Sequence, residues 1–124
     1  MYVSADELDT PADDPIISEY IYANSISSSL SITSSGSATG TSDVSGNSNL
    51  VTKIVTHQYL QKKNGSSWDT IDSWTNTRYT WHTNCSFPYT VTETGQYRIR
   101  TEADVYHNSS YENVDCNSNT VSYP

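Results

Sequence analysis

The chain has 124 residues, a length typical of one domain, and combines 34% hydrophobic residues with a formal net charge of −8. Fourteen acidic residues against six basic ones leave no positive surface, which argues against nucleic acid and anionic membranes as partners. Ten tyrosines and three tryptophans must supply much of the core, because Leu, Ile, Val and Phe are scarce. No apolar run is long enough to span a membrane.

Residues 1–25 form an acidic N-terminal tail, and residues 26–124 form the predicted folded domain. Acidic residues crowd the tail beside Pro11 and Pro15: Asp6, Glu7, Asp9, Asp13 and Asp14. This pattern favours a solvating linker. Weak Ca²⁺ capture is the alternative, although the spacing matches no known loop motif.

The end of the tail is more apolar and predicts a candidate extra strand. Its carriers are Ile16, Ile17, Tyr20, Ile21 and Tyr22. We expect this segment to pair with an open sheet edge of its own domain or of a neighbouring subunit. We also expect Met1 to be an added start residue and an export signal to be missing from this sequence.

Alternation of apolar and polar residues recurs along the rest of the chain, broken by Gly, Asn or Ser, and no window sustains a helical stripe. The expected strands are residues 26–33, 37–44, 50–62, 67–74, 78–91 with an interruption, 95–107 and 111–122. About seven short strands predict an all-β, immunoglobulin-like antiparallel β-sandwich.

The third and fourth strands are expected to form a hairpin, since Asn64 and Gly65 tolerate the positive φ of a tight turn. Both faces of the third strand carry apolar residues, which predicts a central position. On the fourth strand, Trp68 and Trp74 share a parity and are expected on one face, with Ile71 on the other.

In residues 95–107, apolar and charged positions alternate regularly, which predicts a half-buried strand with a charged outer face. Gly95 followed by Tyr97 at the start of this strand resembles the tyrosine corner of Greek-key sandwiches. Tyr97 is therefore interpreted as structural.

Cys85 and Cys116 enclose about thirty residues and lie in no CxxC motif. In an exported protein they would most simply form a disulfide, with Cys116 facing inward or at the margin of the core. Two free thiols are the alternative.

Several short motifs resemble a family of small exported proteins from Gram-positive bacteria, a domain of unknown function with an immunoglobulin-like appearance. The likeness covers roughly residues 26–124. Its carriers are Leu60-Gln61-Lys62-Lys63, Ser67-Trp68, Ser73-Trp74, Gly95-x-Tyr97-Arg98, Val105-Tyr106 and Val121-Ser122-Tyr123. The resemblance implies export and a β-sandwich, and it supplies no catalytic residues. The two cysteines are not part of that pattern, so a bridge between them would be an addition of this protein.

Catalytic chemistry has little support in the sequence. His57, His82 and His107 lie on three separate segments, and no Ser or Cys occupies a nucleophile-elbow motif. A three-histidine metal site is the weaker alternative to surface or partly buried histidines. We therefore predict no catalytic residue, no metal and no cofactor.

An aromatic cluster could bind a ligand, because flat rings stack on the apolar faces of sugars. It comprises Tyr79, Trp81, Phe87 and Tyr89. The scarcity of aliphatic residues favours a place in the core for these rings, whereas exposed rings would make Tyr79, Trp81 and Tyr89 a sugar-binding platform.

The overall prediction is a secreted or cell-surface structural or adhesive module that contacts a second subunit, a glycan or a protein. A carbohydrate-binding module is the alternative.

Overall fold

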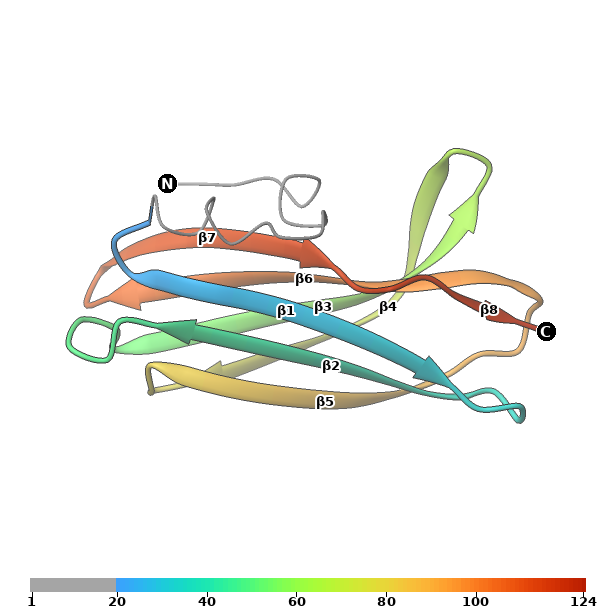
Figure 1. Cartoon of the computed structure of the whole chain (residues 1–124), viewed down its shortest axis with the longest axis horizontal. Coiled ribbons are helices and arrows are strands. Elements are labelled where there is room, and N and C mark those ends of the chain that lie inside the picture. The colour runs from blue at the N-terminus through green and yellow to red at the C-terminus, as the bar shows by residue number, and fades with distance from the viewer. Residues whose placement is uncertain (1–19) are drawn as a thin grey trace.

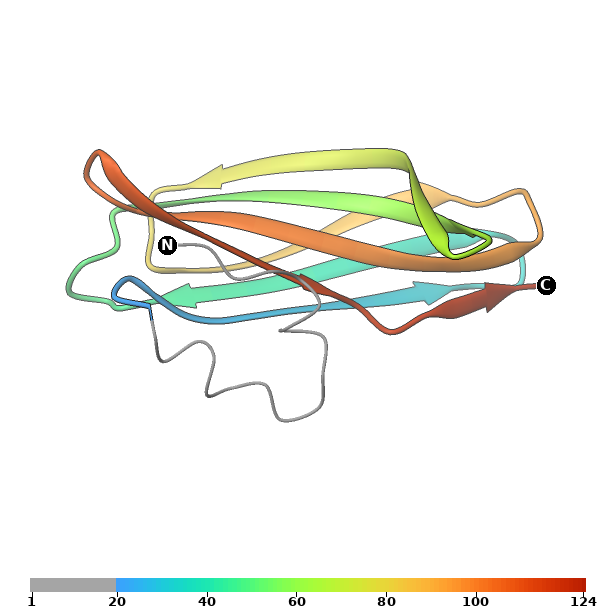
Figure 2. The same cartoon turned by 90° about the horizontal axis from the view of Figure 1, so that it is seen from above.

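The computed structural model describes residues 20–124 as two antiparallel β-sheets packed face to face (Figures 1 and 2). One sheet has three strands in the order β1-β2-β5, and the other has the order β4-β3-β6-β7, with β8 paired to β6. The strands are β1 (Ala23–Ile32), β2 (Ser37–Gly46), β3 (Lys53–Asn64), β4 (Ser67–Arg78), β5 (His82–Thr90), β6 (Gly95–His107), β7 (Ser110–Asn117) and β8 (Val121–Tyr123). The predicted all-β, immunoglobulin-like sandwich is confirmed.

Within residues 20–124, eight strands replace the seven expected, because the last predicted segment is divided in two; the interruption in 78–91 adds no strand, since Arg78 ends β4. The segment 78–91 is split by Tyr79, Thr80 and Trp81, which carry the chain from β4 in one sheet to β5 in the other. The last segment is divided into β7 and β8, which pair with successive parts of β6.

The predicted alternation along β6 is confirmed, since its inward residues from Tyr97 to Val105 are all at most 1% exposed. The core contains two hydrophobic clusters. One is centred on Val44, Ile54 and Val105, and the other on Leu60, Tyr97 and Ile99. β3 and β6 contribute to both clusters, and their inward positions between the clusters are polar.

These polar positions form a buried hydrogen-bonded chain between the clusters. Gln58 Nε2 donates to Ser42 Oγ at 2.7 Å, and Ser42 Oγ lies 2.7 Å from Thr101 Oγ1. The Tyr89 hydroxyl donates to Gln58 Oε1 at 2.8 Å. A Cβ at Gly40 would lie 2.4 Å from that Oε1, so the glycine leaves room for the glutamine. The pairing satisfies polar groups that would otherwise be costly to bury.

The predicted β3–β4 hairpin and the central position of β3 are confirmed. Asn64 pairs with Ser67, and Gly65 has a φ of +63° in the two-residue turn. The hairpin tip projects from the body of the sandwich (Figure 1). β3 lies between β4 and β6.

A bulge in β4 corrects the predicted positions of its tryptophans. Leu60 pairs with Asp72 and Gln61 pairs with Thr70, so Ile71 is the extra residue. An extra residue exchanges the two faces of a strand. Trp74 therefore lies on the inner face opposite Gln58, whereas Trp68 lies on the outer face, although their parity predicted one shared face.

Tyr97 is structural, as predicted. Its hydroxyl donates to the carbonyl oxygen of Glu93 at 2.6 Å and fixes the loop before β6.

The start of the described chain is held by Glu112 of β7, which is 4% exposed. Its carboxylate accepts hydrogen bonds from the backbone N–H groups of Ile21, Tyr22 and Ala23 at 2.8 to 3.0 Å. Tyr20 is also buried against the core. The predicted extra strand falls partly outside the described residues, which exclude Ile16 and Ile17, and residues 20–22 are not in a strand.

The disulfide predicted between Cys85 and Cys116 is not formed in the structure. Neither cysteine is in a disulfide, and both are buried, on β5 and β7 of different sheets. Cys116 Sγ lies 3.3 Å from Ser28 Oγ on β1, and Ser28, Ser42 and Cys85 form one row across the other sheet. Ser28 and Cys85 lie at the two ends of that row, two strand spacings of about 4.8 Å each apart. This separation exceeds the distance of roughly 7 Å that a disulfide allows between its two Cα atoms. Cys116, packed beneath Ser28, is out of reach of Cys85 unless the strands rearrange.

Candidate binding surface

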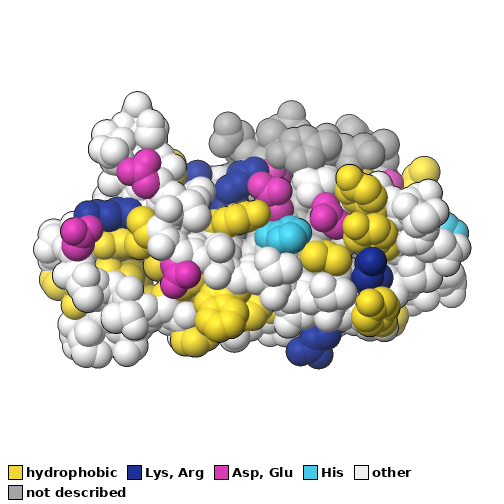
Figure 3. Space-filling model, turned by 180° about the vertical axis from the view of Figure 1, so that it is seen from behind, with side chains coloured by type: hydrophobic (Ala, Val, Ile, Leu, Met, Phe, Trp, Pro, Cys, Tyr) yellow, Lys and Arg dark blue, Asp and Glu magenta, His cyan; other side chains and the backbone are white. Residues whose placement is uncertain are grey.

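The β4 strand is an exposed edge of the five-stranded sheet. Within residues 20–124 it pairs with β3 on one side only, and all twelve of its residues are exposed or half-exposed. Most large exposed hydrophobic side chains of residues 20–124 lie on β4 or in the turn after it: Ile71, Trp74, Tyr79 and Trp81. Figure 3 shows that hydrophobic side chains on the rear face form separate groups with charged side chains between them. The exposed apolar surface therefore concentrates along one strand edge rather than in a cleft.

The four rings predicted to cluster are divided between surface and core. Tyr79 is 81% exposed and Trp81 is 45% exposed, both in the β4–β5 turn. Tyr89 is 5% exposed, and burial raises the pKa of its hydroxyl. Phe87 is partly buried against the core. The structure thus leaves Tyr79 and Trp81 accessible to a ligand and uses Tyr89 in the core.

An aromatic stack joins the two sheets beneath β4. Trp74 and Phe87 lie with ring centroids 5.3 Å apart and planes 7° from parallel. Trp74 remains 44% exposed. The alternation of residues in the sequence did not predict this pair, because the bulge in β4 and the order of the strands together determine which ring packs against Phe87.

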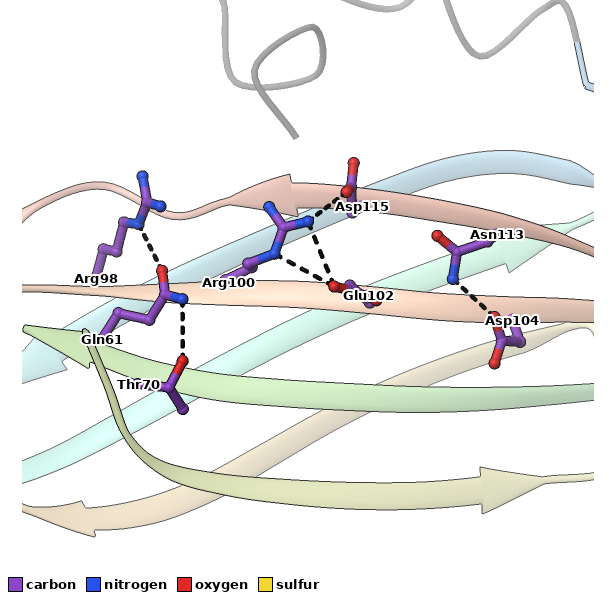
Figure 4. Close-up of polar contacts among 8 residues, drawn as sticks. All are labelled: Gln61, Thr70, Arg98, Arg100, Glu102, Asp104, Asn113 and Asp115. Atoms are coloured by element: carbon purple, nitrogen blue, oxygen red, sulfur yellow. Dashed lines mark hydrogen bonds and ion pairs between the residues drawn. The ribbon is translucent and has the colours of Figure 1, made fainter. Parts of the chain in front are cut away.

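The outer face of β3, β6 and β7 carries a polar network (Figure 4). Arg100 donates to Asp115 at 2.6 Å and lies 3.3 Å from Glu102, while Asn113 donates to Asp104 at 2.7 Å. Opposite charges are thus paired within the sheet, as the alternation on β6 predicted. Burial and the Glu102 carboxylate raise the pKa of neighbouring Tyr59, and Arg100 partly offsets this.

A second network on this face holds the base of the β3–β4 hairpin (Figure 4). Arg98 Nε donates to Gln61 Oε1 at 2.9 Å, and Gln61 Nε2 donates to Thr70 Oγ1 at 3.2 Å. The Arg98 guanidinium lies over the Trp68 ring at 4.3 Å. These contacts explain why Trp68 is half-buried although β4 is an edge.

The three histidines are not brought together. His57 lies on the outer face of β3, 3.7 Å from Asp104, and His82 pairs with Asp43 at 2.7 Å on the other sheet. His107 lies at the end of β6, with its Nδ1 2.7 Å from the Leu50 carbonyl oxygen. Among residues 20–124, no group of three or more His, Cys, Asp or Glu side chains could hold a metal ion. No helix in this part of the chain has the length and apolar character needed to cross a membrane.

Comparisons with known proteins assign this chain to no family. The chain matches no protein-family model, and a search of curated proteins returns no match. Among solved structures it is similar to the CARDB domain of a protein from Pyrococcus furiosus, which was solved in complex with di-metal ions. The identity is 17% and the TM-score is 0.43, with 81% of this chain and 91% of that chain covered. A similarity of this size transfers neither a ligand nor an activity.

Proposed function

We propose that this chain is an exported, non-catalytic structural or adhesive module that works secreted or on a bacterial cell surface. The family resemblance of residues 26–124 supports export, and the Ser-, Thr- and Asn-rich β-sandwich suits an extracellular setting. One observation carries the non-catalytic role. The described histidines and most outer-face charges are engaged in contacts within the sandwich, whereas the β4 edge and the following turn expose their apolar side chains.

Binding to isolated cell envelopes tests this role. The purified chain is expected to bind saturably, and a variant with Tyr79→Ala and Trp81→Ala is expected to bind at least tenfold more weakly, because aromatic side chains dominate many binding surfaces. Tyr111→Ala is the matched control, since Tyr111 is an exposed ring on β7 away from β4. Absence of binding, or equal loss in the control, would count against an adhesive surface at this turn.

A carbohydrate-binding module is the second candidate, favoured by the exposure of Tyr79 and Trp81. Trp81 lies beside His82, with ring centroids 5.7 Å apart, and His82 contacts Asp43. A ring next to polar groups is a common arrangement for sugar recognition, because the ring takes the apolar face and the polar groups take hydroxyls. Affinity electrophoresis in gels containing a neutral polysaccharide tests this candidate. Migration of the chain that is retarded by the polysaccharide, and no longer retarded in Trp81→Ala, would favour sugar binding over protein adhesion.

We also propose that the N-terminal segment contributes a pairing strand, as its apolar residues predict. The full chain with Ile16→Asp and Ile17→Asp is suited to test it, because a truncation at Ser25 would also remove buried Tyr20 and Ala23. Pairing within the chain's own domain predicts an unchanged molecular mass and a lower melting temperature in that variant, and an unchanged melting temperature would rule it out.

A further inference from the structure

The free edge of β4 has the features of a strand-pairing surface. Residues 72–78 pair with β3 without interruption, and the bulge at Ile71 ends this regular segment. The unpaired side of an edge strand presents backbone N–H and C=O groups that another strand can bind. The β5 edge is protected by Pro88, which has no N–H group.

The sequence of this segment is self-complementary. We propose that β4 pairs with β4 of a second copy, antiparallel, about a two-fold axis through Thr75. Asp72 of each copy then lies opposite Arg78 of the other. The remaining opposed pairs are Ser73 with Thr77 and Trp74 with Asn76.

The two faces of β4 restrict the choice of axis. Asp72, Trp74, Asn76 and Arg78 lie opposite inward residues of β3 and so share the inner face. Residues directly opposite one another across a strand pair must lie on the same face of the joined sheet. Among axes through this segment that satisfy the condition, only the axis through Thr75 places Arg78 opposite an acidic residue.

This pairing also covers exposed apolar side chains. Ile71 of one copy approaches Tyr79 of the other at both ends of the paired segment, and Trp74 is shielded beside the second copy's Asn76. The same residues account for most of the large exposed hydrophobic surface on the strand and its following turn. A two-fold, self-complementary contact is also the commonest form of homodimer.

Sedimentation equilibrium of the full chain over a wide concentration range tests the proposal. A monomer has a mass of 13.8 kDa, and we expect a concentration-dependent approach to twice that mass. Asp72→Arg or Arg78→Asp alone places like charges opposite each other twice, and should weaken self-association by about tenfold or more. The double variant D72R/R78D restores opposite charges and should restore association.

Asp69→Arg is the matched control, because Asp69 lies on the same strand beyond the bulge and outside the paired segment. It should leave association unchanged, as should Ile16→Asp with Ile17→Asp. The proposal fails if the native chain remains a monomer, if either single charge reversal leaves the mass unchanged, or if the double variant does not recover association. Loss of association with the Ile16 and Ile17 changes would also overturn it and assign the contact to the N-terminal segment. The dimer and the proposed adhesive surface both use Tyr79, so cell-envelope binding by a chain that remains a monomer would refute the dimer and leave the adhesive role standing.

Discussion

Replacement of Gln58 by leucine should destabilise the sandwich although it makes the core more apolar. Gln58 is fully buried, donates to Ser42 and accepts from the Tyr89 hydroxyl. Leucine is similar in size, so the main effect is to leave that hydroxyl without this partner. A stranded buried polar group costs about 1–3 kcal/mol, and the lost bond to Ser42 adds about 0.5–1.5 kcal/mol. Greater apolar burial offsets part of this, which leaves a predicted loss of about 2 kcal/mol.

Urea unfolding, followed by far-ultraviolet circular dichroism, measures this loss, and the melting temperature should fall by about 10 °C. Tyr89→Phe in the Gln58→Leu background removes the stranded hydroxyl and should recover about 1 kcal/mol. The two changes should therefore be non-additive. Gln96→Leu on the exposed side of β6 is the control and should change stability by less than about 0.5 kcal/mol. A neutral or stabilising Gln58→Leu, or strictly additive effects with Tyr89→Phe, would refute the reasoning.

Three further predictions concern the buried carboxylate, the tyrosines and the thiols. Glu112→Gln should cost about 1–3 kcal/mol and speed hydrogen exchange at Ile21, Tyr22 and Ala23, because a neutral amide offers one acceptor oxygen where the carboxylate offers two; unchanged exchange would contradict this. Burial raises the folded-state pKa of Tyr89 and Tyr97 above the ordinary value near 10, so their contribution to stability is full below about pH 10 and is lost as pH rises through the folded pKa. As the pH rises through that range, the urea midpoint should fall less in Tyr97→Phe than in the native chain. An equal fall in both proteins would argue against a contribution from Tyr97. Cys85 and Cys116 should resist a thiol reagent in the folded protein and both react in denaturant, whereas no reaction in non-reducing denaturant would demonstrate a disulfide.

The regular strands were predictable from the sequence because the alternation of apolar and polar residues indicates which face of the strand each residue occupies. The alternation in β6 placed Tyr97, Ile99 and Val105 inside, and Gly95 before Tyr97 indicated the corner contact that the Glu93 carbonyl completes. The Asn64-Gly65 pair likewise located the hairpin, since its turn depends on neighbouring residues alone.

Features that depend on distant segments were not predictable in this way. The sequence of β4 alone does not indicate the bulge at Ile71, because the bulge is defined by the register of β4 against Leu60 and Gln61 of β3. Glu112 meets residues about ninety positions earlier, which no local pattern reports.

The candidate surface was anticipated only in part. The scarcity of aliphatic residues predicted aromatic rings in the core, and Tyr89 is such a buried ring. Tyr79 and Trp81 are exposed because they belong to the turn that passes between the sheets, whose place depends on the strand order.

The claim that this module works outside the cell is common to both proposed functions, and fractionation of the cells that produce it tests that claim most directly. Cells would be separated into medium, envelope and cytosol, and the chain would be quantified in each fraction with a specific antibody alongside a cytosolic marker. We predict that the chain is recovered in the medium or the envelope, without the marker. Recovery of the chain with the marker in the cytosol would contradict the account.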